Sequence, residues 1–202
     1  DTFINPNDKI QVDQVRNDYD RVRSSAKSGD PHELLALRSL AFTHESEGYV
    51  RGAYSAYVML ELYHSKSKDR EDNLFNLVRT SSLVGEVMNT EKYGHIFLAK
   101  YPNSKYKEQV RSMMLISLFY SGEYEVALEV SEKFLPTLAE NSKQHDLCLH
   151  VYSGSLYYTA RFFDAHPHIV KHVNMYPKSE YKKASQYFEG SNLSRMQNWS
   201  LA

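Results

Sequence analysis

Histidines are the side chains of this sequence that could most readily do chemistry. His166 and His168 flank Pro167, and His172 lies four residues after His168, so the last two would share one face of a helix. Two imidazoles on one helix face can begin a zinc site, with Asp164 as a third ligand. A metal-dependent enzyme is therefore one hypothesis. We favour ordinary surface histidines, because the chain has nine histidines and no HExxH pattern.

Other signatures of catalysis are absent from the sequence. It has no GxSxG nucleophile elbow, no glycine-rich phosphate loop and no GxGxxG fingerprint. The single cysteine, Cys148, excludes an intramolecular disulfide or a cysteine-rich metal site, and we expect a small buried apolar side chain there. We therefore predict a noncatalytic protein with no catalytic residues, no metal and no cofactor.

The composition narrows the classes of partner. The 202 residues are 42% hydrophobic, enough to bury a substantial core. A net charge of −1, from 24 basic and 25 acidic side chains, argues against nonspecific binding of nucleic acid or anionic lipid. No run approaches the roughly 18 apolar residues that span a bilayer. A protein partner or a peptide segment is the remaining expectation.

Helices must position these side chains, because apolar residues recur three and four positions apart along most of the chain. We predict no strand. A leading helix is expected over 8–27, where five apolar side chains form one stripe, and the cluster Ser28-Gly29-Asp30-Pro31 ends it. The stripe consists of Val12, Val15, Tyr19, Val22 and Ala26.

One phrase occurs twice in the sequence. Tyr101-Pro102-Asn103-Ser104-Lys105-Tyr106 returns 75 residues later as Tyr176-Pro177-Lys178-Ser179-Glu180-Tyr181. Proline ends one helix because it has no N–H to donate, and the serine is expected to cap the next helix. The interval equals two units of about 37 residues, close to the period of tetratricopeptide helix pairs.

Aligning the helix pairs predicts an all-α protein, a right-handed α-solenoid of about four tetratricopeptide-like pairs with an extra helix at each end. Ala53, Ala127 and Ala165 occupy the crossing position of the second helix, where the second unit has Thr90. The predicted parts of a single domain over 1–190 are the leading helix 8–27, repeats at about 31–66, 69–102, 105–141 and 144–177, and a capping helix 179–190. Residues 191–202 are expected to be a polar tail.

The Tyr-Pro-x-Ser-x-Tyr junction between lengthened repeats resembles the bacterial envelope branch of this superfamily. The likeness is greatest to BamD-like outer-membrane assembly lipoproteins and periplasmic Tol-Pal coordinator proteins, and covers roughly residues 31–190. It implies a noncatalytic scaffold in the periplasm, associated with the outer membrane. The lipoproteins begin with a lipid-bearing cysteine, whereas Asp1 stands first here, so the resemblance allows a lipid anchor only upstream. A cytoplasmic adaptor or secretion chaperone is the alternative.

A partner segment is expected in the concave groove, which the first helix of each pair lines in tetratricopeptide proteins. The transferred positions are aromatic and basic, the side chains that dominate many interfaces. The competing interpretation is that about half of the aromatic rings pack between helices. The predicted groove residues are Arg38, Phe42, Phe75, Arg79, Ile116, Phe119, Tyr120, His150, Tyr157 and Tyr158.

Overall fold

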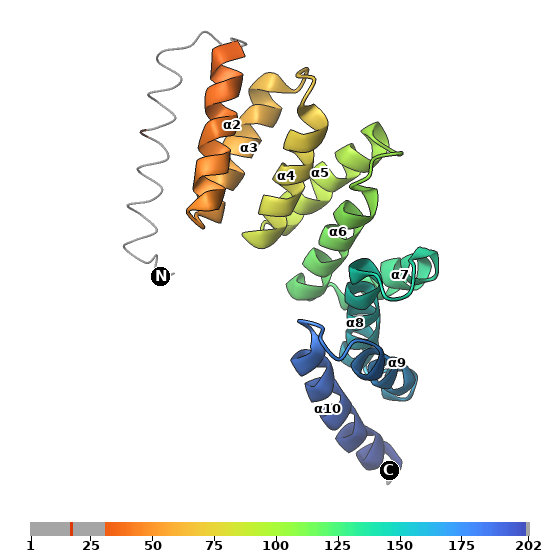
Figure 1. The fold of residues 1–202 in the computed structure, drawn as a ribbon. Coiled ribbons are helices and arrows are strands. Elements are labelled where there is room, and N and C mark those ends of the chain that lie inside the picture. The colour runs from red at the N-terminus through yellow and green to blue at the C-terminus, as the bar shows by residue number, and fades with distance from the viewer. Residues whose placement is uncertain (1–16, 18–30, 201–202) are drawn as a thin grey trace. The chain divides into compact units, whose positions relative to one another are not determined.

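Every regular element in the part of the chain that the computed structural model describes, Asn17 and residues 31–200, is helical (Figure 1). Apart from Asn17, the predicted leading helix 8–27 lies outside the described residues. The chain divides into two compact units, 1–104 and 105–202, where the sequence predicted one domain over 1–190. The boundary falls inside the first copy of the repeated phrase, two residues after Pro102.

Unit 1 contains two helix pairs whose helices pack in chain order. They are α2 (Pro31–Ser46) with α3 (Val50–His64), and α4 (Arg70–Leu83) with α5 (Val87–Lys100). Gly48 and Gly85 make the turns within the pairs at φ of 76° and 79°, a conformation that glycine adopts without strain. The fully buried core includes Leu37, Ala41, Ala53, Leu60, Leu74, Leu77, Val78 and Phe97.

Unit 2 contains two further pairs and a last helix. They are α6 (Lys107–Ser121) with α7 (Tyr124–Phe134), which continues into the 3₁₀ turn η1 (Leu135–Thr137), then α8 (Lys143–Tyr158) with α9 (Phe162–Met175), and α10 (Lys182–Ser200). Helix α8 packs against α6, α7, α9 and α10, so it is the centre of this unit. Cys148 on α8 is fully buried, and burial raises the pKa of its thiol to about 12, which confirms it as an apolar core residue.

Small side chains stand where the helices of each pair cross. Ala53, Ala127 and Ala165 are fully buried at the predicted crossing positions. Thr90, the exception, is also fully buried, and its hydroxyl has two acceptors for its one hydrogen, Ser81 Oγ at 3.1 Å and the Glu86 carbonyl at 3.0 Å. A polar residue is tolerated at this crossing because its hydroxyl is hydrogen-bonded.

The serines of the repeated phrase make long-range hydrogen bonds that the sequence did not predict. Helix α6 has Tyr106, and not Ser104, at its N-cap position. Ser104 Oγ donates to Glu71 at 2.6 Å, and Ser179 Oγ donates to Asp146 at 2.8 Å. Each bond spans 33 residues and ties the end of a helix pair to the first turn of that same pair. Ser179 Oγ also accepts from the N–H of Tyr181 at 3.0 Å, directly before α10 begins at Lys182, in line with its predicted role at the start of that helix.

Helix α10 runs through Gly190 to Ser200, so the predicted end at Gly190 and the polar tail over 191–202 were wrong for residues 191–200. Asn192 is fully buried and its side-chain N–H donates to the Phe162 carbonyl at 2.9 Å. Met196 packs against the core of unit 2. These two contacts hold the continuation in place. In the described part of the chain, no helix combines the length and the apolarity that crossing a membrane requires.

Candidate partner-binding site

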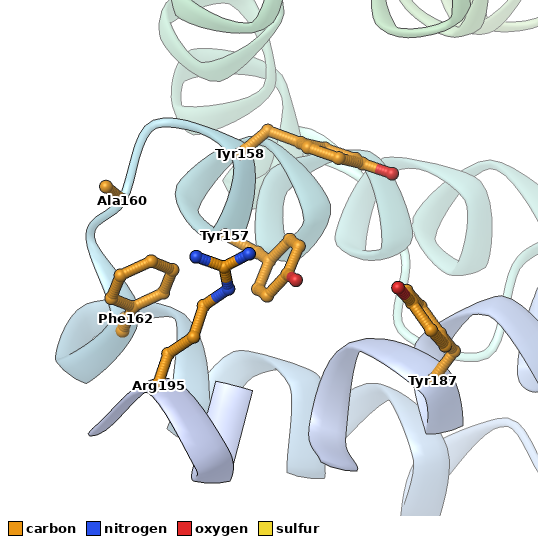
Figure 2. A pocket seen from close by; sticks show the side chains of 6 residues that line it. All are labelled: Tyr157, Tyr158, Ala160, Phe162, Tyr187 and Arg195. Carbon is orange, nitrogen blue, oxygen red and sulfur yellow. The ribbon is translucent and has the colours of Figure 1, made fainter. Parts of the chain in front are cut away.

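Two adjoining hollows lie on unit 2 and share Tyr158 and Tyr187. We call them together the tyrosine hollow. Its neutral end has a volume of about 250 Å³ and its arginine end one of about 310 Å³. The neutral end is lined by Phe119, Tyr120, Tyr124, His150, Tyr158, Ala184, Tyr187 and Phe188. The arginine end is lined by Tyr157, Tyr158, Ala160, Phe162, Tyr187 and Arg195 (Figure 2).

Helix ends supply most of the lining. Tyr120 lies in the last turn of α6, which stops because Gly122 takes a left-handed φ of 89° and its N–H donates to the carbonyls of Leu118 and Phe119. Tyr158 is the last residue of α8. Helix α10 contributes Tyr187 and Arg195, and the first residues of α7 and α9, Tyr124 and Phe162, complete the lining, so five helices meet at this site.

The floor of the hollow is buried and its rim is exposed. Phe119, His150, Tyr157 and Phe188 are each less than 9% exposed. Tyr120, Tyr158 and Tyr187 on the rim are 70%, 46% and 66% exposed. The floor can therefore support a bound side chain, while the rim can contact it.

Ring contacts hold the floor together. The Phe119 ring lies 5.6 Å from each of Tyr124 and His150, and Tyr158 stacks on Tyr124 at 4.3 Å. His150 in turn stacks on Phe188 at 5.8 Å. Rings packed in this way keep one arrangement, so a ligand need not order the floor when it binds.

The neutral end carries no formal charge at neutral pH. Burial lowers the pKa of His150 to about 3, so its imidazole is neutral, and its Nδ1 lies 2.9 Å from Ser185 Oγ. Burial also raises the pKa of Tyr158 and of Tyr120, and the nearby Glu180 adds to the increase at Tyr120. This end of the hollow therefore suits an uncharged, largely apolar group.

The arginine end contains a cation over two rings. The Arg195 guanidinium lies 5.5 Å from the ring centre of Phe162 and 5.8 Å from that of Tyr157. Figure 2 shows it between these two rings, with Tyr158 above it and Tyr187 at the right of the view. The Tyr157 hydroxyl is fixed by Ser191 Oγ at 2.6 Å.

Five of the six groove residues predicted in unit 2 line this hollow, namely Phe119, Tyr120, His150, Tyr157 and Tyr158. Ile116 does not, because it packs against the core of unit 2. All six residues were predicted to line the surface of one groove. In the structure, Phe119, His150 and Tyr157 form the buried floor of the hollow. Sequence reasoning missed Tyr187 and Arg195, since α10 was expected only to cover the end of the stack.

The arginines predicted for the groove in unit 1 already have acidic partners. Arg38 pairs with Asp69 at 2.6 Å, and Arg79 pairs with Glu45. Phe42 is 73% exposed and Phe75 is half-buried. The charges of both arginines are compensated within unit 1, which leaves them less available to acidic groups of a partner.

The histidines considered as metal ligands are engaged separately. His172 is fully buried with its Nε2 2.8 Å from Asp146 Oδ1, and His168 meets the Tyr152 ring edge-on at 4.8 Å. Asp164 pairs with Arg161. Within the described residues, no three His, Cys, Asp or Glu side chains gather closely enough to hold a metal ion.

Comparison with known proteins bears on the fold. The sequence matches no protein-family model and no curated protein. It is similar in structure to nearly identical TPR-like repeats of a kinesin light chain-type protein from Podosopora anserina. A single-substitution variant of those repeats aligns with a TM-score of 0.61 and 14% identity, over 82% of this chain and 87% of that chain. A second structure of those repeats gives 0.58 and 15%, over 84% and 90%. At these identities the likeness shows the fold alone: this is an all-α chain of tetratricopeptide-like helix pairs.

Proposed function

We propose that this chain is a noncatalytic protein-interaction scaffold whose second unit binds a segment of a protein partner in the tyrosine hollow. The observation that carries the proposal is the convergence of Tyr120, Tyr158 and Tyr187, from three different helices, over a buried aromatic floor. Exposed aromatic side chains gathered at a hollow are typical of binding sites rather than of ordinary surface.

Tyrosines suit this role for a physical reason. Each offers a large apolar face and one hydroxyl, and loses the freedom of only two side-chain torsions on binding. The floor beneath them is packed before any ligand arrives, so little of the binding energy is spent on ordering it. An extended or helical partner segment could place one or two side chains in the hollow.

The test is the double variant Tyr120→Ala/Tyr187→Ala. Partners are first captured from native cell extract and solubilised envelope, and the affinity of the purified partner is then measured by calorimetry. We expect binding at least about tenfold weaker, equivalent to roughly 1.4 kcal/mol. Circular dichroism should show an unchanged helical spectrum, because both side chains are exposed.

The matched control is Val126→Ala/Val130→Ala, which removes two exposed apolar side chains from α7 of the same unit, outside the lining of the hollow. Its affinity should stay within about twofold of the wild type. Equal affinities of the tyrosine variant and the wild type would move the binding site away from the hollow.

For the cellular location we propose the bacterial envelope, with the chain acting in outer-membrane assembly or a related envelope complex. The support is the Tyr-Pro-x-Ser-x-Tyr junction and its resemblance to envelope proteins. Fractionation of the native cells into cytosol, periplasm and outer membrane tests this, with marker proteins for each fraction. Recovery in the cytosol would contradict the proposal and favour the adaptor or secretion-chaperone alternative.

A further inference from the structure

We infer that the tyrosine hollow recognises an acidic side chain lying next to a large apolar side chain in the partner segment, with Arg195 as the group that binds the carboxylate. This inference rests on the proposed function, because it names the chemistry of the segment that the hollow would take.

Arg195 differs from the other arginines of the described residues in its partners. Six of the seven arginines in the described residues form ion pairs with acidic side chains: Arg38 with Asp69, Arg51 with Glu86, Arg70 with Glu61, Arg79 with Glu45, Arg111 with Glu108, and Arg161 with Asp164. Within this part of the chain, Arg195 has no acidic partner and faces the rings of Tyr157 and Phe162 instead. The arginine with an uncompensated charge is therefore the one that lines a hollow.

The Arg195 guanidinium is already oriented over two rings and still has N–H groups to donate. Ring faces attract the cation but accept none of its N–H groups in the way a carboxylate does. A guanidinium already held over two rings loses less freedom when it binds a carboxylate, and its planar fork can donate two parallel hydrogen bonds. Arg195 is also exposed, so an incoming carboxylate can reach it.

The two ends of the hollow suit two different side chains of one partner segment. No charged residue lines the neutral end, so a carboxylate there would lose its hydration without gaining a counter-charge. A large apolar side chain can fill that end instead. Because both ends share Tyr158 and Tyr187, the neighbouring residue of the partner then lies beside Arg195.

Three blocked dipeptides test the inference on the full chain: acetyl-Phe-Glu-amide, acetyl-Phe-Gln-amide and acetyl-Phe-Lys-amide. They share the apolar ring and differ in the charge of the second side chain. Binding is followed by NMR of isotope-labelled tyrosine rings. We expect the glutamate peptide to bind about fivefold more tightly than the glutamine peptide, and the lysine peptide to bind most weakly.

The variant Arg195→Gln should abolish the preference for the glutamate peptide over the glutamine peptide. The matched control is Arg111→Gln. Its guanidinium also lies over a ring, 5.7 Å from that of Phe134, but outside the lining of the hollow. This control should retain the wild-type preference, which separates the loss of a carboxylate partner from the general loss of an arginine–ring contact.

Four results would overturn the inference. Equal affinities for the three peptides would make the hollow an uncharged apolar site, and tightest binding of the lysine peptide would make it a cation site. If acetyl-Phe-Gln with a free C-terminal carboxylate bound more tightly than acetyl-Phe-Glu-amide, Arg195 would recognise the C-terminal carboxylate of a partner and not an acidic side chain. Self-association of the wild type that Arg195→Gln removes would assign the hollow to a second copy of the chain. In the first three cases the proposed function stands if Tyr120→Ala/Tyr187→Ala still weakens partner binding.

Discussion

At the scale of single residues, the buried histidines of unit 2 couple its stability to pH. His145, His150 and His172 all lie in the interior, and burial lowers the pKa of each. At His172, the hydrogen bond to Asp146 opposes the decrease. Each is therefore more easily protonated in the unfolded chain than in the folded one. Protonation then favours unfolding.

We therefore expect acid to destabilise the protein. For His150, stability is fully present above the unfolded pKa of about 6.5 and is lost as the pH falls from there towards the folded pKa of about 3. This histidine alone should lower the free energy of unfolding by on the order of 2 kcal/mol between pH 7 and pH 5. Urea unfolding at a series of pH values measures the decrease.

The variant His150→Phe/Ser185→Ala isolates this contribution. Phenylalanine keeps the ring contacts with Phe188 but cannot be protonated, and Ser185→Ala removes the hydroxyl that would lose its partner. The decrease between pH 7 and pH 5 should become smaller by about 2 kcal/mol. An unchanged decrease in this variant would show that His150 does not titrate as its burial implies.

Removing metal ions should not change the stability of the protein. His172 is committed to Asp146, and His168 packs against Tyr152. We expect no stoichiometric zinc in purified protein and a melting temperature unchanged by EDTA. Bound zinc that is lost in both His168→Ala and His172→Ala would contradict this expectation and support the hypothesis of a metal-dependent enzyme.

At the scale of elements, the repeated phrase fastens each helix pair to its own start. Its spacing was readable from the sequence because proline and serine mark helix junctions. The two serine–carboxylate hydrogen bonds could not be predicted from the sequence. Ser104 and Ser179 each reach a carboxylate 33 residues earlier, and short-range patterns carry no information about such distant partners. The separation of floor from rim in the tyrosine hollow was unpredictable for the same reason.

Ser179→Ala should destabilise the junction. Asp146 Oδ1 accepts hydrogen bonds from both Ser179 and His172, so the substitution leaves a half-buried carboxylate with one donor fewer. It also removes the oxygen that accepts from the N–H of Tyr181. We expect the free energy of unfolding to fall by about 1–2 kcal/mol. Ser46→Ala, which removes only an exposed bond to the Thr43 carbonyl, should cost less than about 0.5 kcal/mol. Similar decreases in the free energy of unfolding for the two variants would mean that the bond from Ser179 to Asp146 contributes no more than an exposed local bond.

Helix α8 carries a glycine that the aromatic floor requires. A Cβ at Gly154 would lie 2.7 Å from the Phe119 ring and 3.0 Å from the Phe188 ring. We expect Gly154→Ala to destabilise the protein by about 1–3 kcal/mol, despite the better helix propensity of alanine, and to weaken peptide binding in the hollow. Thermal unfolding and the NMR titration measure the two effects.

Gly190→Ala is the matched control, since it is also within a helix and a Cβ there meets nothing within 4 Å. Helix propensity alone should make it about 0.5–1 kcal/mol more stable than the wild type. Stabilisation by both substitutions would show that the rings at Gly154 move aside freely.

At the scale of the whole molecule, periodicity was sufficient to predict helix pairs. Three observed pairs lie within one predicted repeat each, and the fourth begins at Lys143, one residue before its predicted repeat. It could not predict the division at Ser104, since both sides repeat the same pattern. Nor could it predict the full length of α10. That helix has no strong apolar stripe, and a buried side-chain amide, Asn192, fixes its continuation. Arg195 lies in this continuation of α10, so it was not among the predicted site residues.

Unit 2 should fold by itself, because its aromatic and aliphatic core is built from its own helices. We expect a fragment of residues 105–202 to give a helical circular dichroism spectrum, to unfold cooperatively and to bind acetyl-Phe-Glu-amide within about twofold of the full chain. A fragment without cooperative unfolding would show that unit 2 depends on the first unit for its stability.

The single cysteine of the chain can report how often the core of unit 2 opens. Cys148 is fully buried in α8 and the sequence holds no other cysteine, so a thiol reagent can react only after this core opens. The rate of labelling in native buffer therefore reports how often the interior of unit 2 becomes accessible to solvent. A ligand seated in the tyrosine hollow should lengthen that interval, which makes partner occupancy readable without any added probe on the protein.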